Sequence, residues 1–570
     1  MQRRSVWIVA ASVAAVALGA AAVGALALLL RGQGTGFSSS EGHLELRLDG
    51  EVPEQPARDF EAFFERRPPS LRTLVESLDR AARDPGVQGV TVRVGSLPDS
   101  GWGKVQELRE ALGRFRASGK PVYAHLETAG NREYYLATAC SKIYAVPTAL
   151  LDVTGLAAEV TFFRGSLDKL GIEAQFEGVG KYKNAPNQAT ERGFTEPHRE
   201  QMEALLDSVF DQYLDALAEG RGKTREEARA LVDRGPYTAR EALDAGLVDE
   251  LLYQDELESR LEGSERLTPG RYVRSARGVG FDGRPRVALV YAVGEIMPGE
   301  SQDGPFGGDG FAGSDTVSGA LRQAREDHAV KAIVLRVDSP GGSGTASDVI
   351  WREVQLARKE KPVVVSMGDV AASGGYYIAM AGDAIVAQPG TVTGSIGVFG
   401  GKLSLRGLYD KLGVTREILT RGRHADLFTD YRRWNDEERA AMRGLMEAFY
   451  EDFIRKAAEG RKMEEQEVHA VAQGRVWTGA QALKNGLVDR LGGLSDALAL
   501  AKSKAGISPD QEVALVVLPE RKGVFDLLLQ NRDQDAWKGL SSEVRALLRL
   551  AGALQGGTLL ARLPFDLRIR

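Results

Sequence analysis

The sequence lacks the residues that several classes of functional site require. Among its 570 residues there is one cysteine, Cys140, which excludes disulfide frameworks, cysteine-rich zinc sites and iron–sulfur clusters. Neither sign of charge dominates, because 73 lysines and arginines stand against 79 aspartates and glutamates, a net charge of −6. A nucleic-acid-binding protein normally carries a basic patch or stripe, so we expect no nucleic-acid partner. The length, at roughly 150 residues per domain, predicts at least two cores.

One long apolar run is present, and it lies at the N-terminus. The 25 residues from Val6 to Leu30 contain no charge, and Arg3 and Arg4 precede them. About 20 apolar residues cross a bilayer, whereas the apolar part of a cleaved signal is normally about 7 to 15 residues long. We therefore expect residues 1–31 to be an uncleaved membrane anchor, with a cleaved secretory signal as the alternative. The two arginines favour a cytoplasmic N-terminus, which would place the rest of the chain outside the cytoplasm.

The rest of the chain contains an internal repeat. Ala218–Leu251 and Ala458–Leu491 align without a gap at an offset of 240, and 14 of the 34 positions are identical. Upstream, DKLGI at Asp168 matches DKLGV at Asp410 at an offset of 242. In each half, short β-branched runs alternate with helical patterns, which is typical of βαβ units and a parallel sheet. The sequence therefore predicts an α/β fold that is used twice.

This repeat sets the expected domain boundaries. Residues 42–262 form the first α/β repeat and residues 287–505 the second. Between them, residues 263–286 are rich in Gly, Pro and Arg and are predicted to be a linker. Residues 506–570 form a tail of unclear role that contains one short strand.

The halves differ most in their glycine-rich turns. The second half has Asp-Ser-Pro-Gly-Gly from Asp338 and then Ala-Ala-Ser-Gly-Gly around Ser373, where the first half has Asn131 in the position of the serine. A serine flanked by small residues leaves room for a substrate carbonyl. The backbone N–H groups of Gly374 and of the Gly342 turn could stabilise the oxyanion. The alternative is that small residues only allow a helix to pack tightly on a sheet.

A nucleophilic serine needs a base. The chain has six histidines, none of them in a glycine-rich turn, and His424 is the least unfavourable of them. The first half also has Gly-Lys-Tyr-Lys-Asn-Ala-Pro, in which Lys183 falls on Ala425 at the offset of 242. A lysine acts as a base only if its amine is neutral, which burial favours by lowering its pKa. Spacing alone leaves both kinds of base open.

Together these motifs resemble a known family. Asp-Ser-Pro-Gly-Gly, Ala-Ala-Ser-Gly-Gly-Tyr-Tyr, Thr-Gly-Ser-Ile-Gly-Val, Gly-Arg-Val-Trp-Thr-Gly and Gly-Lys-Tyr-Lys are similar to those of the signal peptide peptidase A (protease IV) family in its long, duplicated form. The resemblance covers about residues 40–500. It implies two tandem crotonase-like or Clp-protease-like domains and a serine protease with a Ser/Lys dyad. Such an enzyme degrades cleaved signal peptides and other short hydrophobic peptides.

The resemblance also assigns roles by motif. It implies that Ser373 is the nucleophile and Lys183 the general base. Gly342 and Gly374 are then the oxyanion donors. Ser395 orients the lysine, with a helix cap or turn as the alternative reading of that serine.

The resemblance further implies a homo-tetramer on the bacterial inner membrane, with its catalytic domains on the extracytoplasmic, periplasmic side and no cofactor or metal. Two other functions stay open at this point. A crotonase-type acyl-CoA enzyme would share the fold and the oxyanion donors, but it needs no serine paired with a lysine. A catalytically silent membrane scaffold would use the duplicated domains for assembly alone.

Overall fold

The computed structural model describes residues 42–55, 68–97, 100–261, 264–276, 283–302, 310–519 and 560–562. The expected membrane anchor at residues 1–31 lies outside these ranges. Within the described ranges, no helix is both long and apolar enough to span a bilayer.

The first half is built on a seven-stranded sheet with the order β6-β4-β3-β2-β1-β8, in which β7 also pairs with β4. The central strands pair in parallel, as the apolar runs predict. The strands are β1 (Gly42–Leu48), β2 (Val87–Val94), β3 (Val122–Ala129), β4 (Lys142–Leu151), β6 (Tyr237–Thr238), β7 (Glu250–Leu251) and β8 (Glu265–Leu267). Strand β8 and helix α12 (Pro269–Ala276) lie within the stretch whose composition indicates a linker, and β8 pairs with β1.

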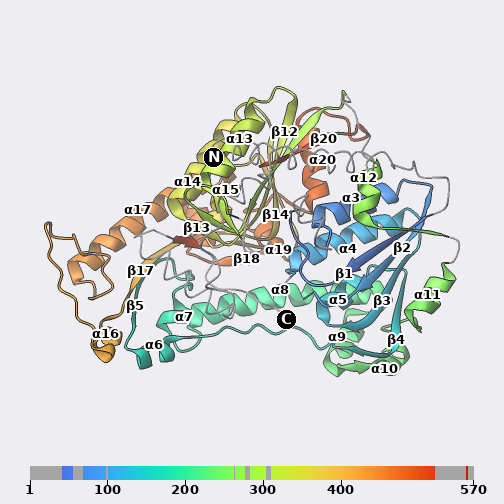
Figure 1. Ribbon diagram of the computed structural model, residues 1–570, viewed down its shortest axis with the longest axis horizontal. Helices are drawn as coiled ribbons and strands as arrows, with labels where there is room; N and C mark the ends of the chain where they lie inside the picture. Colours follow the sequence, from blue (N-terminus) through green and yellow to red (C-terminus); the bar gives the residue numbers. More distant parts are fainter. Residues whose placement is uncertain are drawn as a thin grey trace, which may run out of the picture.

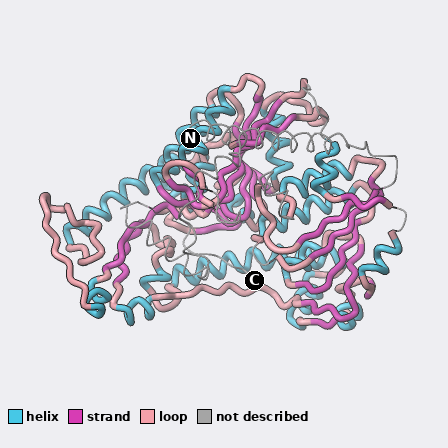
Figure 2. The backbone as a smooth tube through the Cα atoms, viewed as in Figure 1, coloured by secondary structure: helices cyan, strands magenta, loops and turns pink. Residues whose placement is uncertain are grey.

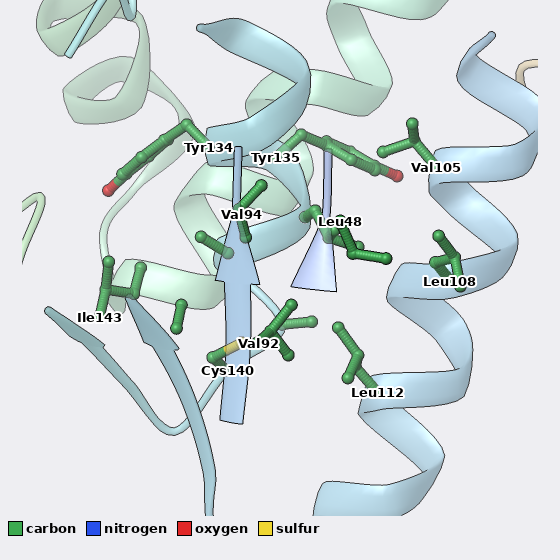
Figure 3. Close-up of a cluster of buried hydrophobic side chains, with 14 of the residues drawn as sticks. Leu48, Val92, Val94, Val105, Leu108, Leu112, Tyr134, Tyr135, Cys140 and Ile143 are labelled. Atoms are coloured by element: carbon green, nitrogen blue, oxygen red, sulfur yellow. The ribbon is translucent and has the colours of Figure 1, made fainter. Parts of the chain in front are cut away.

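Apolar side chains fill the space between this sheet and its helices. In Figure 3, Val92 and Val94 of β2 face Leu108 and Leu112 of a neighbouring helix, and Cys140 lies among them. Burial raises the pKa of the Cys140 thiol to about 12, so it stays protonated at neutral pH. The helices of this half are α3 (Leu71–Ala81), α4 (Trp102–Ala117), α5 (Asn131–Ala137), α8 (Glu196–Arg221), α9 (Arg225–Arg234), α10 (Ala239–Asp244) and α11 (Gln254–Arg260).

The second half repeats this design on an eight-stranded sheet with the order β18-β16-β14-β12-β9-β20, in which β15 also pairs with β14 and β19 pairs with β15. Its strands are β9 (Arg286–Val293), β12 (Val330–Ser339), β14 (Val363–Ala372), β15 (Ala384–Ala387), β16 (Val392–Gly394), β18 (Val476–Thr478), β19 (Arg490–Leu491) and β20 (Ala514–Leu518). Strand β20, the short strand predicted in the tail, pairs in parallel with β9.

The helices of the second half show the duplication directly. Helix α17 (Asp436–Arg461) and α8 each have 26 residues, and their bounds differ by 240 positions. The other helices are α13 (Ser314–Glu326), α14 (Gly344–Arg358), α15 (Gly374–Ala379), α16 (Arg406–Leu412), α18 (Glu465–Val471), α19 (Gly479–Lys484) and α20 (Leu494–Lys504). The predicted α/β fold, used twice along the chain, is therefore observed.

A third sheet joins the two halves, in the order β11-β10-β13-β21-β17-β5. After β4 the first half leaves its own sheet through a long loop and α6 (Arg164–Leu170), and it adds β5 (Glu173–Val179) antiparallel to β17 (Val398–Ser404). Helix α8 then returns along the bottom of the molecule to the first sheet (Figure 1), and Figure 2 shows the loop that runs alongside it. The remaining elements are β10 (Glu295–Met297), β11 (Phe311–Gly313), β13 (Gly341–Ser343), β21 (Leu560–Arg562) and α7 (Asn187–Thr190).

Candidate active site

Ser373 lies at the sharp turn between β14 and α15 and is fully buried. Its φ of 55° and ψ of −113° place it in a backbone region that side-chain-bearing residues rarely adopt. Its N–H donates to the carbonyl of Gly394 at 2.8 Å, and its own carbonyl accepts from the N–H of Tyr377 at 2.8 Å. Such outliers persist only where the surroundings hold them, and they cluster at active sites.

The crossing segment of the first half brings Lys183 to this serine. The Lys183 Nζ lies 2.7 Å from the Ser373 Oγ. It also donates to the Ser395 Oγ at 2.9 Å and to the Ser395 carbonyl at 3.0 Å. These contacts are made within one chain. The structure thus brings together three of the five residues that the motifs single out.

The surroundings of Lys183 favour its neutral amine. The side chain is buried, and burial lowers the pKa of the Lys183 ammonium well below its ordinary range. All three of its hydrogen-bond partners are uncharged oxygens of two serines. Desolvation without an opposing negative charge favours the uncharged form, which is the form that can accept a proton from a hydroxyl.

A turn of the second half holds the backbone of Lys183 in place. The N–H of Tyr182 donates to the carbonyl of Gln473 at 2.8 Å. A Cβ atom on Gly474 would come within 2.5 Å of the Lys183 nitrogen, so only glycine fits there. The next residue, Arg475, accepts the N–H of Ser395 at 2.7 Å. The Gly-Arg-Val-Trp-Thr-Gly motif, to which sequence reasoning gave no role, therefore positions both Lys183 and Ser395.

The two glycines proposed as oxyanion donors lie at the neighbouring turns. Gly374 is the first residue of α15, so its N–H has no partner within the helix. Gly342 lies in β13 with a φ of 154°, and a Cβ there would come within 2.1 Å of the Ile296 carbonyl oxygen. The turn before β13 lies next to the serine turn, because Ser339 pairs with Ala371 across β12 and β14.

In the first half, the residue at the position of Ser373 is engaged in hydrogen bonds with a loop. Asn131, which replaces the serine, donates from Nδ2 to the Gly155 carbonyl at 2.8 Å. Its Oδ1 accepts the N–H groups of Thr154 and Gly155 at 3.2 Å each. The side chain is therefore engaged in holding a loop.

His424, the histidine considered as an alternative base, lies in an exposed loop, where its Nε2 is 3.9 Å from a carboxylate oxygen of Glu437.

Sequence reasoning missed a buried group of charges behind the site. The Lys104 Nζ, from α4 of the first half, lies 3.1 Å from Asp338 and 3.5 Å from Asp369. These aspartates precede the glycine turn and the serine turn. Asp369 also accepts the N–H groups of Gly101 and Lys104 at 2.9 and 2.7 Å, and Asp338 accepts the N–H of Val370 at 3.0 Å. Through its contacts with Asp338 and Asp369, Lys104 of the first half therefore helps to hold the glycine turn and the serine turn of the second half.

This geometry agrees with the similarity to known proteins. The model of peptidase family S49 matches residues 114–268 and 355–508, and the Clp protease model matches residues 314–390. The chain is 37% identical to the chloroplastic serine protease SPPA of Arabidopsis thaliana, over 83% of this chain and 71% of that one. It is 31% identical to Protease 4 of Salmonella typhi, over 90% of this chain and 87% of that one. A putative signal peptide peptidase SppA of Enterococcus faecium is 39% identical over 32% of this chain and 54% of its own length.

The fold and these matches define a serine-type peptidase. The chain belongs to peptidase family S49, whose model matches it once in each half. The resemblance to the signal peptide peptidase A (protease IV) family is thereby confirmed, as is the duplicated architecture. The Clp-protease-like fold is confirmed by the family model that matches the segment from α13 to the end of β15.

Proposed function

We propose that this S49 peptidase is a membrane-anchored endopeptidase in which Ser373 is the nucleophile and Lys183 the general base. The observation that carries this is the 2.7 Å contact between the Lys183 amine and the Ser373 hydroxyl, both buried and without a countercharge on the amine. In the first step Lys183 takes the hydroxyl proton while the Ser373 Oγ attacks the peptide carbonyl. Gly342 and Gly374 donate their N–H groups to the oxyanion.

The remaining steps use the same groups. The protonated Lys183 gives its proton to the leaving amine, which leaves an acyl-enzyme on Ser373. The neutral amine then activates a water molecule, which hydrolyses the ester and frees the serine. Throughout, Ser395 holds the amine through its hydroxyl and carbonyl oxygens. Every proton in the cycle passes through one nitrogen atom, so no cofactor or metal is required.

Cleaved signal peptides and other short hydrophobic peptides are the proposed substrates. An apolar cluster lies beside the nucleophile and includes Ala372, the residue before it. Its members come from both halves: Ala158, Val160, Phe194, Met202, Leu205, Val370, Val392 and Val476. Its partly buried members, Ala158, Val160, Phe194 and Val370, would favour apolar substrate side chains through the hydrophobic effect. The anchor at residues 1–31 would hold the site on the extracytoplasmic face of the bacterial inner membrane, where these substrates arise.

An acylating probe that reacts with activated serines tests the proposal directly. The purified protein is expected to be labelled, and Ser373→Ala is expected to lose the label, because the hydroxyl beside Lys183 is the one activated for attack. Ser77→Ala should remain labelled and serves as the matched control, since Ser77 is a buried serine of the first half that donates to the Leu74 carbonyl, outside the site. A folded protein that takes no label would support the scaffold, and turnover of an acyl-CoA by an unlabelled protein would support the crotonase-type enzyme.

We further propose a homo-tetramer, and the internal repeat supports a contact between copies of the chain. Strand β5 pairs with β17, and at the offset of 242 these strands align with residues 415–421 and 156–162. Residues 415–421 form an exposed loop in which Ile418 and Leu419 are 40% and 93% exposed. The same pairing made between chains would join this loop to residues 156–162 of the next copy. Repetition of such a contact around a rotation axis closes a ring.

Light scattering with size-exclusion chromatography tests this assembly. The protein is expected to elute as a tetramer, and Leu419→Glu is expected to shift it to monomers, because a carboxylate cannot be buried without a partner at the contact. Leu445→Glu is the matched control, since Leu445 is 57% exposed on α17, outside residues 415–421. A wild-type monomer, or equal dissociation by both substitutions, would contradict the proposed contact.

A further inference from the structure

The side chain of Arg475, in the Gly-Arg-Val-Trp-Thr-Gly motif, lies over two aromatic rings. Its guanidinium carbon is 4.7 Å from the ring centre of Tyr182 and 4.5 Å from that of Trp477. A guanidinium within about 6 Å of a ring centre is attracted to the face of that ring. Tyr182 belongs to the first half and directly precedes Lys183, whereas Trp477 belongs to the second half. One side chain therefore joins the two halves beside the proposed base.

The Glu200 carboxylate, on helix α8 of the first half, holds this arrangement from outside. The Arg475 Nη1 donates to the Glu200 Oε1 at 2.6 Å, and the Tyr182 hydroxyl donates to the same oxygen at 3.0 Å. Hydrogen bonds from Arg475 and Tyr182 lower the pKa of the Glu200 carboxyl, so it is ionised at neutral pH. Lys181 lies farther from this carboxylate, at 3.9 Å. Arg475, Tyr182 and Glu200 thus contact one another in a closed set, which we call the arginine latch.

The backbone beside the arginine latch is bonded to the base and to its hydrogen-bond partner. The N–H of Tyr182, the residue before Lys183, donates to the carbonyl of Gln473 at 2.8 Å. The carbonyl of Arg475 accepts the N–H of Ser395 at 2.7 Å, and Ser395 accepts from the Lys183 amine. A displacement of Arg475 would therefore move the lysine relative to the serine that holds it.

The second ring under the guanidinium supports the nucleophile. Trp477 lies against Gly394, because a Cβ atom on this glycine would come within 2.9 Å of the Trp477 Cδ1. The Gly394 carbonyl accepts the N–H of Ser373 at 2.8 Å. The indole is itself fixed by a hydrogen bond from its Nε1 to the Val471 carbonyl at 2.8 Å. Arg475 is therefore in contact with the support of the base on one ring and with the support of the nucleophile on the other.

The proposed dyad is sensitive to small displacements because its two members come from different halves. The Lys183 Nζ and the Ser373 Oγ are 2.7 Å apart, and a misplacement of about 1 Å can lower a rate about 10²-fold. The pKa of the Lys183 ammonium is low because the side chain is buried, so water beside a displaced amine would raise it. A contact that keeps the halves in register preserves both the short distance and the neutral amine.

We propose that Arg475 is a positioning residue that, through the arginine latch, holds Lys183 in register with Ser373 across the two halves. This inference rests on the function proposed above. The guanidinium takes no proton and binds no substrate in this role. It acts through Tyr182, Trp477 and Glu200, which are the side chains it contacts.

Arg475→Met tests the inference, because methionine keeps an apolar stem and lacks the guanidinium. For a short apolar peptide we expect kcat to fall about 10²-fold. KM should stay within about twofold, since the Arg475 side chain lies outside the apolar cluster proposed to bind the substrate. The limb of the pH profile assigned to Lys183 should move to higher pH by about one pH unit, because a looser lysine segment is better hydrated.

Arg439→Met is the matched control. Arg439, on α17 of the second half, also bonds a glutamate of the first half, with its Nη1 3.0 Å from the Glu177 Oε1. Its guanidinium is bonded to β5 instead of the arginine latch, so kcat and the pH limb should match those of wild type. Equal effects of Arg439→Met and Arg475→Met would show a general loss of contact between the halves and would overturn the inference.

Two substitutions of Tyr182 test the stacking separately. Tyr182→Phe keeps the ring under the guanidinium and loses one hydrogen bond, so kcat should stay within about fivefold of wild type. Tyr182→Leu removes the ring and should lose about as much as Arg475→Met. Because residues in contact are not additive, the double variant Arg475→Met/Tyr182→Leu should lose no more than about threefold beyond either single variant. Losses that multiply would overturn the inference.

The outcomes for this inference and for the proposed function are distinguishable. An active wild type whose kcat is unchanged in Arg475→Met overturns the inference alone, and so does a loss of kcat with the pH limb in its wild-type place. Hydrogen exchange in a Ser373→Ala background needs no activity. The Tyr182 N–H should exchange faster when Arg475→Met is added and at an unchanged rate with Arg439→Met. Equal rates in both would overturn the inference even if the wild type proved inactive, a result that would overturn the proposed function.

Discussion

Lys183→Met is expected to lower kcat/KM for a short apolar peptide by about 10²- to 10⁴-fold, the contribution typical of a positioned general base. Methionine approximates the length and the apolar stem of lysine, so the buried space stays filled. It provides no group able to take the Ser373 proton, which the wild-type amine reaches over 2.7 Å. Initial rates with a fluorogenic peptide, measured for wild type and variant at one pH, give the ratio.

Lys181→Met is the matched control for this substitution. Lys181 belongs to the same short segment, but its side chain is 55% exposed and faces the Glu200 carboxylate. Exposed ion pairs contribute about 0 to 1 kcal/mol, so this variant should keep kcat/KM within a few-fold of wild type. Near-normal turnover by Lys183→Met, or an equal loss in both variants, would remove Lys183 from the mechanism.

The same lysine sets the expected pH dependence. Because burial lowers the pKa of the Lys183 ammonium, kcat/KM should rise with pH through that lowered pKa and level off above it. A solvated lysine has a pKa of about 10.4, so a limb that levels off well below this value is the signature of the buried amine. The limb should be absent from the residual activity of Lys183→Met. A wild-type profile that still rises near pH 10 would contradict the assignment.

Lys104→Met is expected to reduce the free energy of unfolding by about 3 to 5 kcal/mol at pH 8, the range found when one partner of a buried ion pair is removed. The substitution leaves Asp338 and Asp369 close together without the ammonium that lies between them. Urea titration followed by intrinsic fluorescence measures the loss. Lys142→Met, which removes an exposed contact to Asp249, should cost less than about 1 kcal/mol.

The pH dependence of this loss distinguishes charge from packing. Burial, opposed by Lys104, raises the pKa of the Asp369 carboxyl to about 6. A carboxyl whose folded pKa is raised stabilises the fold at low pH, and this contribution is lost as pH rises through the folded pKa. Removing the lysine raises that pKa further, so the deficit should be smaller at pH 5 than at pH 8. Adding Asp369→Asn should recover part of it. A deficit that is equal at both pH values would indicate lost packing instead.

Much of this structure could be predicted from the sequence because the repeat supplies an internal comparison. The offset of 242 aligned Ser373 with Asn131 and Lys183 with Ala425, and it identified the turns in which the halves diverge. The pairing of serine with lysine was carried by the family resemblance, and the structure places the two side chains in contact. Residues whose proposed role depends on a distinctive local motif could therefore be predicted from the sequence.

What the sequence could not reveal depends on contacts between distant segments. Lys104 lies in an ordinary helical pattern, and its burial follows only from the docking of α4 on the second half. Strand β5 and residues 415–421 occupy equivalent places in the repeat, yet one is a paired strand and the other an exposed loop. The difference arises because β5 meets β17 of its own chain. Strand β21 could not be predicted either, because three residues are too few to show a strand pattern in the sequence. It forms a strand through its pairing with β13.

The crossing of the first half over the second also determines when the protein can become active. During synthesis the segment that carries Lys183 leaves the ribosome long before Ser373, and the turn at Gln473 and Gly474 that fixes the lysine follows still later. Domains generally fold in the order in which they are made, so under the proposed mechanism a completed first half would have the base and no nucleophile. The proposed active site would therefore be complete only after residue 474 has been translated, and the growing chain could not cleave peptides before that point.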